Sequence, residues 1–230
     1  MRSVESGPLF IDTFFRPDLI IRYGPDIVRA MGVTVAVALL VIVTGLLLGL
    51  VLAVVRSYRL WPVSVLVVCF ADILRALPPL VMLLIAYFGL PNVGITLSNY
   101  AVLWLVLSLV LAAFSEEILW AGLLSIRKGQ WEAARSTGLT FTQTLVHIVL
   151  PQAVRQCVPP LTSRAIVTTK YTAIGSVIGV PEILGVSSTA QSVVGNSTPL
   201  MIGALAYVLL FVPLVIVGRW IETRFQWVRV

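Results

Sequence analysis

Long apolar segments separated by short polar ones make up most of this chain. No Asp, Glu, Lys or Arg occurs within residues 30–55, 76–115 or 183–218. Each of these stretches exceeds the roughly 20 residues that an α-helix needs to cross the hydrocarbon core of a bilayer. The pattern therefore predicts an all-α, polytopic membrane protein and not a domain folded around one water-surrounded core.

Five transmembrane helices are the simplest interpretation of the pattern. We expect them near residues 27–55, 61–88, 99–124, 148–179 and 200–220. Pro25 precedes the first span, and Arg56 follows it. The segment 180–199 is rich in Gly, Ser and Thr, so we expect a surface loop there. No second domain or internal repeat is apparent in the sequence.

The distribution of basic residues predicts the orientation. Lys and Arg follow the first, third and fifth spans, at Arg56, Arg59, Arg127, Lys128, Arg135, Arg219, Arg224 and Arg229. The segments 89–98 and 180–199 contain neither residue. Because basic residues are enriched in cytoplasmic loops, we predict the N-terminus outside and the C-terminus in the cytoplasm. The predicted parts are an external arm (1–26), a transmembrane domain (27–224) and a cytoplasmic tail (225–230).

Composition excludes several other classes of protein. Hydrophobic residues make up 59% of the chain and charged residues 11%, whereas about a quarter of a soluble protein is charged. The net charge of +6 comes from basic residues beside the apolar segments, which argues against nucleic-acid binding. Cys69 and Cys157 lack metal-type or redox-type spacing, so we expect reduced packing residues and predict no metal site.

A polar segment between the third and fourth spans, residues 129–150, is expected to form two short helices at the membrane surface. In the first, Gln130 to Thr137, Glu132 lies near the N-terminus and Arg135 near the C-terminus, as the helix dipole favours. Gly138 follows as a residue able to adopt the left-handed conformation that ends a helix.

Thr140 is expected to cap the second short helix, residues 141–149, which ends before Pro151. From these residues alone, the segment could be an interfacial loop without a partner, or a surface on which another protein docks.

The motif Glu132-Ala133-Ala134, followed by Gly138 and Leu150-Pro151, resembles the EAA motif of ABC importer membrane subunits. Further segments resemble the polar amino acid branch of that family, at residues 75–81, 87–91, 125–135, 150–153, 159–161 and 176–182. The resemblance covers about residues 33–224. It implies the transmembrane domain of a type I importer in the bacterial inner membrane.

The resemblance also implies a set of partners. A permease of this family pairs with an identical or sister subunit in the lipid membrane, binds two ATPases and receives substrate from an extracytoplasmic binding protein. The residues implied to couple to the ATPase are Gln130, Glu132, Ala133, Ala134, Arg135, Gly138 and Pro151.

No catalytic residue is predicted in this chain. It contains no Gly-x-x-x-x-Gly-Lys-Ser/Thr phosphate loop, so ATP and magnesium are expected to bind the partner ATPase.

A passive channel is one rival interpretation, although it gives no reason for an ATPase-docking segment. An intramembrane hydrolase is the other, suggested by Glu116-Glu117, but the only histidine, His147, lies in the polar segment.

Charged residues within the second span predict an internal ion pair. Asp72 and Arg75 are three residues apart and share one helix face. Ionisable groups at this depth usually face the bundle interior or a water-filled cavity. Arg75 is therefore a candidate for the substrate pathway, with a purely structural pair as the alternative, and Asp72 is a candidate gate or packing residue.

The fourth span combines prolines with polar residues. Pro159-Pro160 is expected to kink or unwind the helix, and broken helices with polar groups at depth form many transporter sites. The candidate pathway residues beyond it are Arg164, Thr168, Lys170 and Tyr171. Relatives often have an acid or amide at the position of Arg164 and Lys-Asp at Lys170-Tyr171. The more positive local charge predicts that the substrate is an acidic amino acid or an opine-like carboxylate. The alternative is that Arg164 pairs with an acid of a partner subunit.

Glu116 and Glu117 lie near the cytoplasmic end of the third span. We expect them to bind Arg127 or Lys128 and to act in gating or packing. Gly45 and Gly49 form a small-xxx-small pair, which predicts a helix-packing face.

Overall fold

The computed structural model describes residues 6–225, with side chains from Phe10 onward, and every regular element in that range is a helix. The elements are α1 (Ser6–Phe14), α2 (Pro17–Ser57), α3 (Trp61–Ala76), α4 (Pro79–Gly89), η1 (Leu90–Val93), α5 (Asn99–Ser125), α6 (Lys128–Ser136), α7 (Phe141–Thr144), η2 (Leu145–Val149), α8 (Leu150–Lys170), η3 (Tyr171–Ile178), α9 (Ile183–Val194) and α10 (Thr198–Phe225). Of the predicted tail 225–230, only Phe225 lies within the described residues.

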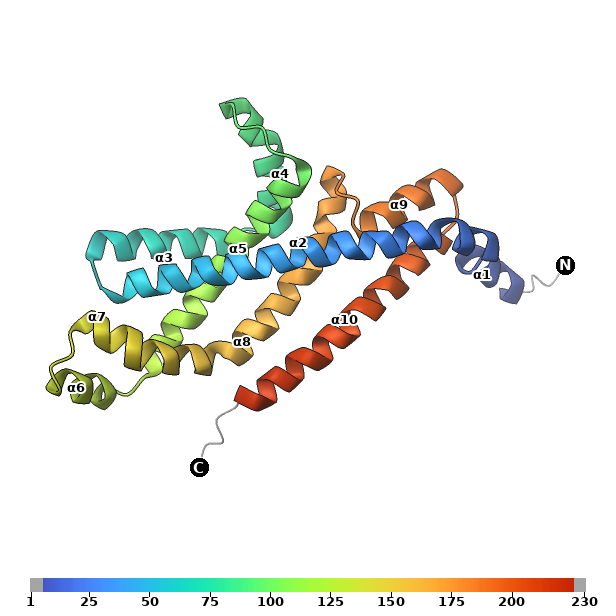
Figure 1. Ribbon diagram of the computed structural model, residues 1–230. Helices are drawn as coiled ribbons and strands as arrows, with labels where there is room; N and C mark the ends of the chain where they lie inside the picture. The colour runs from blue at the N-terminus through green and yellow to red at the C-terminus, as the bar shows by residue number, and fades with distance from the viewer. Residues whose placement is uncertain (1–5, 226–230) are drawn as a thin grey trace.

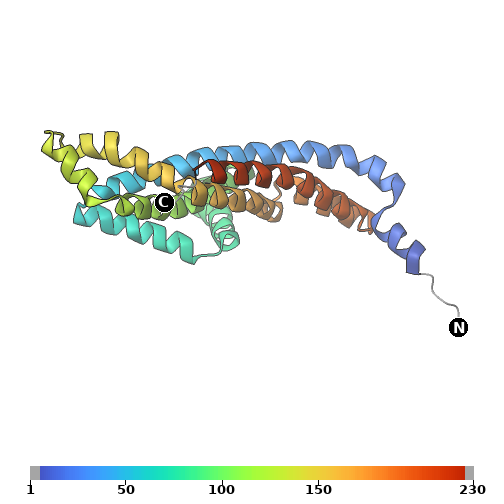
Figure 2. The same ribbon diagram turned by 90° about the horizontal axis from the view of Figure 1, so that it is seen from below.

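The helices form an elongated, flat bundle whose two ends differ in content (Figures 1 and 2). The short helices α6 and α7 lie at one end, beside the turn between α2 and α3, whereas α1 and α9 lie at the other. Within the described residues, α2, α5 and α10 are long and apolar enough to cross a membrane, and two bent helix pairs bring the count to as many as five. This agrees with the predicted number of spans.

Helix α2 begins at Pro17, ten residues before the predicted start of the first span at residue 27. Pro25 therefore lies inside the helix and does not precede it. The reason is packing, because Ile27 is fully buried in a cluster with Ile183 of α9 and Ala206 of α10. These contacts outweigh the loss of one backbone hydrogen bond at proline.

Helices α2 and α5 pack closely through two glycines. A Cβ atom at Gly49 would lie 2.5 Å from the Ser115 Cβ and 2.9 Å from the Ala112 carbonyl oxygen, and one at Gly45 would lie 2.8 Å from the Leu111 Cβ. Only glycine allows the two backbones to approach this closely. The predicted packing role of this glycine pair agrees with the structure.

The second predicted span, 61–88, is not one continuous helix. Helix α3 ends at Ala76 and the chain turns by 104° into the segment Pro79–Val93. Leu77 and Pro78 both have extended backbone angles because each precedes a proline, and the residue before proline disfavours the helical conformation. Pro79 then lies in the first turn of α4, where its missing N–H is not needed.

Of the two effects expected at Pro159-Pro160, a kink or an unwinding of the helix, the unwinding does not occur. Helix α8 continues through both prolines to Lys170, and the helix tightens only afterwards, in the 3₁₀ segment η3. Prolines are tolerated inside membrane helices when neighbouring helices support the segment. On α8, Cys157 packs against Gly122 of α5, and Thr162 packs against Gly218 of α10.

The segment 180–199 contains a helix, α9, and is not the predicted surface loop. Ile183 and Ser187 are buried, and Ser187 packs against Gly203 of α10. The hydroxyls that suggested a loop instead donate to backbone carbonyls one turn earlier, as in the 2.6 Å bond from Ser187 to the Ile183 oxygen. Hydroxyl residues can therefore be accommodated in a helix whose other face is packed.

Candidate functional site

Helix α6 projects from one end of the molecule and has one buried face (Figure 1). Ala134 is buried, whereas Gln130, Glu132, Ala133 and Arg135 are exposed. Gly138 follows with a φ of +88°, in the left-handed region predicted for it. The exposed residues are thus available for contact with another protein.

Helix α7 begins with a capping box and packs against α6 through an aromatic contact. The Thr140 hydroxyl accepts a hydrogen bond from the Gln143 backbone N–H, and the Gln143 side chain accepts one from the Thr140 N–H. This capping box agrees with the predicted role of Thr140. The Trp131 and Phe141 rings stack with centroids 5.3 Å apart, so the two short helices have a defined relative position.

The second short helix does not end before Pro151, as the sequence suggested. Residues Leu145–Val149 form a π-helical turn, η2, and the chain then continues directly into α8. Pro151 lies in the first turn of α8. A continuous helical path therefore runs from Phe141 to Ile178.

Five charged side chains connect α2, α3 and α5 near this end of the bundle. The fully buried Glu116 carboxylate accepts a 2.9 Å bond from Arg56. Glu117 lies 3.4 Å from Arg75 and 3.8 Å from Arg56, and Arg75 also binds Asp72 at 2.5 Å. The predicted pairing of Asp72 with Arg75 is present.

The expected partners of Glu116 and Glu117, Arg127 and Lys128, are not the ones found. Arg127 and Lys128 lie beyond the end of α5 and are exposed, whereas Arg56 of α2 lies directly across the packed helix seam. A buried carboxylate requires a partner within hydrogen-bonding distance, and only the tertiary arrangement supplies Arg56.

A pocket of about 310 Å³ lies at the break between α3 and α4. Arg75, Arg164 and Tyr171 line it together with Phe114 and the residues 76–79. The Arg164 guanidinium carbon lies 3.1 Å from the centroid of the Phe114 ring, and its buried Nε has no hydrogen-bond partner within the described chain. The pocket thus contains two cations, an aromatic face and a phenol hydroxyl.

Two other predicted pathway residues do not reach this pocket. Thr168 is fully buried and donates a 3.0 Å bond to the Arg164 carbonyl oxygen. The Lys170 ammonium lies 5.8 Å from the Phe211 ring centroid, on the side of α8 that faces α10. The structure therefore groups Arg75, Arg164 and Tyr171 and separates Thr168 and Lys170 from them.

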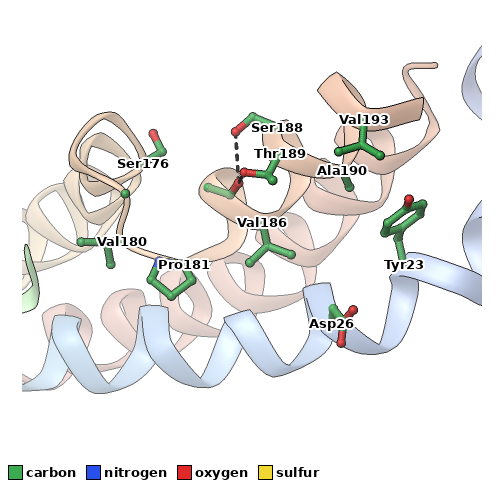
Figure 3. Close-up of a pocket in the computed structure, with 12 residues that line it drawn as sticks. Tyr23, Asp26, Ser176, Val180, Pro181, Val186, Ser188, Thr189, Ala190 and Val193 are labelled. Atoms are coloured by element: carbon green, nitrogen blue, oxygen red, sulfur yellow. Dashed lines mark hydrogen bonds between the residues drawn. The ribbon is translucent and has the colours of Figure 1, made fainter. Parts of the chain in front are cut away.

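A second pocket, of about 360 Å³, lies at the opposite end of the molecule between α2 and α9. Figure 3 shows Tyr23 and Asp26 of α2 on one side of the pocket and Val186, Ala190 and Val193 of α9 on the other. The Asp26 carboxylate accepts a 3.1 Å bond from Arg29. None of these residues was a sequence-based candidate, because residues 1–26 were expected to form an external arm and residues 180–199 a loop.

Glu182 is a further residue that received no role from the sequence. Its buried carboxylate accepts hydrogen bonds from the Gly185 N–H at 2.6 Å and the Leu184 N–H at 3.0 Å, and so caps α9. The Tyr207 hydroxyl of α10 donates a third bond at 2.6 Å. The sequence contains one indication of this role, an acidic residue directly before an apolar run.

Comparison with known proteins gives consistent matches over most of the chain. Residues 45–227 match the family model for the inner membrane component of binding-protein-dependent transport systems. A probable glutamine ABC transporter permease of Bacillus subtilis (strain 168) is 36% identical over 84% of this chain and 90% of its own length. An arginine transport system permease of the same strain is 30% identical over 88% of this chain and 93% of its own.

Solved structures give the same result. The fold matches a chain from the crystal structure of an amino acid ABC transporter with histidines, at a TM-score of 0.81 and 28% identity. The match covers 89% of this chain and 96% of the other. A chain of the MetNI methionine ABC transporter matches at a TM-score of 0.64 and 22% identity, which supports the fold alone.

Proposed function

Because the chain belongs to the family of inner membrane components of binding-protein-dependent transport systems, we propose that it is the permease subunit of an ATP-driven importer of polar amino acids. The names of its relatives, permeases for glutamine and arginine, support an amino acid as substrate. As the family implies, it is a multi-pass protein of the inner membrane.

The main observation in support of ATP-driven import is the projecting pair of helices α6 and α7. Ala134 is buried and Phe141 stacks on Trp131, while Gln130, Glu132 and Arg135 are exposed on a segment of defined shape. A separate ATPase, which binds ATP and magnesium, docks there in this proposal. A passive channel has no use for such a surface.

The helical path from α7 through η2 to α8 supports the coupling of docking to transport. Arg164 and Tyr171, which line the pocket at the α3–α4 break, belong to α8 and η3. A displacement of α7 by the ATPase would therefore move two pocket residues without an intervening flexible loop.

The charge of this pocket supports a substrate with surplus negative charge. Arg75 is already bound to Asp72 and Glu117, whereas Arg164 has no carboxylate within ion-pair distance among the described residues. A free cation in a partly buried pocket favours a carboxylate ligand. The proposed substrate is thus an acidic amino acid or an opine-like carboxylate, and the alternative is that Arg164 binds an acid on a second permease subunit.

The proposed assembly contains a second permease subunit, two ATPases and an extracytoplasmic binding protein. The orientation follows from the basic residues: the end with α6 and α7 faces the cytoplasm, and the N-terminus lies outside. The rival hydrolase loses support, because Glu116 and Glu117 are bound to Arg56 and Arg75 and not to a base or nucleophile.

Coupling can be tested in the importer reconstituted with its ATPase. We expect the double variant Glu132→Lys/Gly138→Val to hydrolyse ATP but to lower substrate uptake about tenfold, because valine strains the left-handed backbone and lysine reverses the docking charge. Gly94→Val is the control for strain, since Gly94 has a φ of +81° and open space around it but lies far from α6. Fully coupled uptake by the correctly inserted double variant would refute the proposal.

Substrate charge can be tested by competition for uptake among glutamate, glutamine and arginine. We expect glutamate to compete best. Arg164→Gln should weaken the competition by glutamate about tenfold, which corresponds to the loss of one charged hydrogen bond. Lys170→Gln removes the same charge from the same helix outside the pocket and should change competition little. Strong inhibition by arginine alone would contradict the anionic substrate.

A further inference from the structure

A third pocket, of about 430 Å³, lies between the α2–α3 turn, the C-terminal end of α5 and the inner face of α6. Figure 1 shows that α6 and this turn lie at the same end of the bundle. Arg59 and Lys128 line the pocket with the rings of Trp120 and Trp131, and Glu132 contributes one carboxylate. The transport function proposed above assigns no role to Arg59 or Lys128.

Arg59 has an unusual backbone conformation. Its φ of +56° is the only positive value for a residue other than glycine among the described residues. The left-handed conformation is unfavourable for a residue other than glycine, and glycine at this turn would adopt it without strain. Such strain is typically found where a side chain has a function.

The charges of the pocket match a single anionic group. Neither Arg59 nor Lys128 lies within ion-pair distance of a carboxylate in the described part of the chain, whereas the nearby Arg56 is bound to Glu116. With Glu132 included, the formal charges of Arg59, Lys128 and Glu132 give the pocket a net charge of +1. One phosphodiester would neutralise it.

The surroundings place the pocket at the depth of lipid headgroups. Trp61, two residues after Arg59, is 79% exposed, and tryptophans are enriched at the membrane–water interface. Leu60 and Leu124 are 60% and 57% exposed and form an apolar surface next to the cations. A ligand with a phosphate and an acyl chain fits this combination better than a free anion.

We propose that this pocket binds the phosphodiester of an anionic phospholipid, with Arg59 and Lys128 as the phosphate ligands. Basic pockets at the cytoplasmic ends of membrane helices bind such headgroups in other proteins. Ser57 and Glu132 line the same pocket. Each has a side-chain oxygen that can accept a hydrogen bond from a hydroxyl of the headgroup. The lipid would occupy the space beneath α6 and so fix its position on the bundle.

The test uses native mass spectrometry of the full chain, delipidated in a neutral detergent and titrated with phosphatidylglycerol or phosphatidylcholine. We expect the wild type to retain one phosphatidylglycerol about tenfold more tightly than phosphatidylcholine. Arg59→Gly/Lys128→Gln should lose this preference. Arg59→Gly alone should melt at no lower temperature than the wild type, because glycine accepts the turn without strain.

The matched control is Arg224→Gly/Arg127→Gln, which removes two exposed cations that do not line the pocket and should keep the preference. Three outcomes overturn the proposal. The first is an equal loss of preference in the control variant. The second is displacement of the lipid by excess inorganic phosphate, which would identify a free-anion site. The third is loss of the lipid when the ATPase binds, which would assign the pocket to that protein.

Discussion

Two proline pairs in this chain have opposite effects on their helices. At Pro78-Pro79 the helix ends and the chain turns by 104°, whereas α8 continues through Pro159-Pro160 to Lys170. The local chemistry is the same, because each pair removes two backbone donors and restrains the residue before it. The cause of the difference therefore lies outside these residues.

The surroundings of the two pairs explain the difference. Leu77 and Pro78 are exposed, so in the described chain no buried contact of theirs supports a helix there. The other pair lies between two close contacts, Cys157 with Gly122 on one side and Thr162 with Gly218 on the other. Packing on α5 and α10 thus stabilises a helix that its own sequence disfavours.

The largest expected effect comes from removing one of these contacts. Gly122→Leu would place a side chain where the Cys157 sulfur lies, and we expect it to lower the free energy of unfolding by about 3 kcal/mol. Thermal unfolding of the purified chain measures this change. Gly32→Leu is the control, since Gly32 is exposed and a Cβ there meets nothing within 4 Å. Equal melting temperatures for the two variants would show that the contact does not support α8.

A smaller effect, of opposite sign, is expected from replacing the prolines. Pro159→Ala/Pro160→Ala restores two backbone donors in an intact helix and should raise the free energy of unfolding by about 2 kcal/mol, after the greater freedom of the unfolded chain is deducted. Pro78→Ala/Pro79→Ala should change it by less than about 1 kcal/mol, because α3 has already ended there. The same thermal measurement compares both double variants. Equal stabilisation by the two double variants would contradict the inference that packing holds α8 helical through its prolines.

Local features of the fold could be predicted from the sequence where they depend on neighbouring residues. The left-handed Gly138, the cap at Thr140 and the Asp72–Arg75 pair all involve groups within a few positions of one another. The long apolar helices were likewise evident, since only the bilayer thickness and composition decide them.

Features that depend on distant residues could not be predicted in this way. Glu116 binds Arg56, which is 60 positions away, and Arg164 meets Phe114 of another helix. The start of α2, the helix α9 and the continuity of α8 each depend on buried contacts with other helices. Of the predicted pathway residues, the tertiary fold brings together Arg75, Arg164 and Tyr171, and no local pattern distinguishes them from Lys170.

The π-helical turn η2 determines the direction in which the rest of α8 points. A π-turn holds about one residue more than an α-turn, and each residue advances a helix by roughly 100° around its axis. Deleting one codon within Leu145–Val149 would therefore rotate the whole downstream helix by about that angle and aim the Arg164 guanidinium at a different neighbour. The direction in which Arg164 points from α8 therefore depends on the five residues of η2.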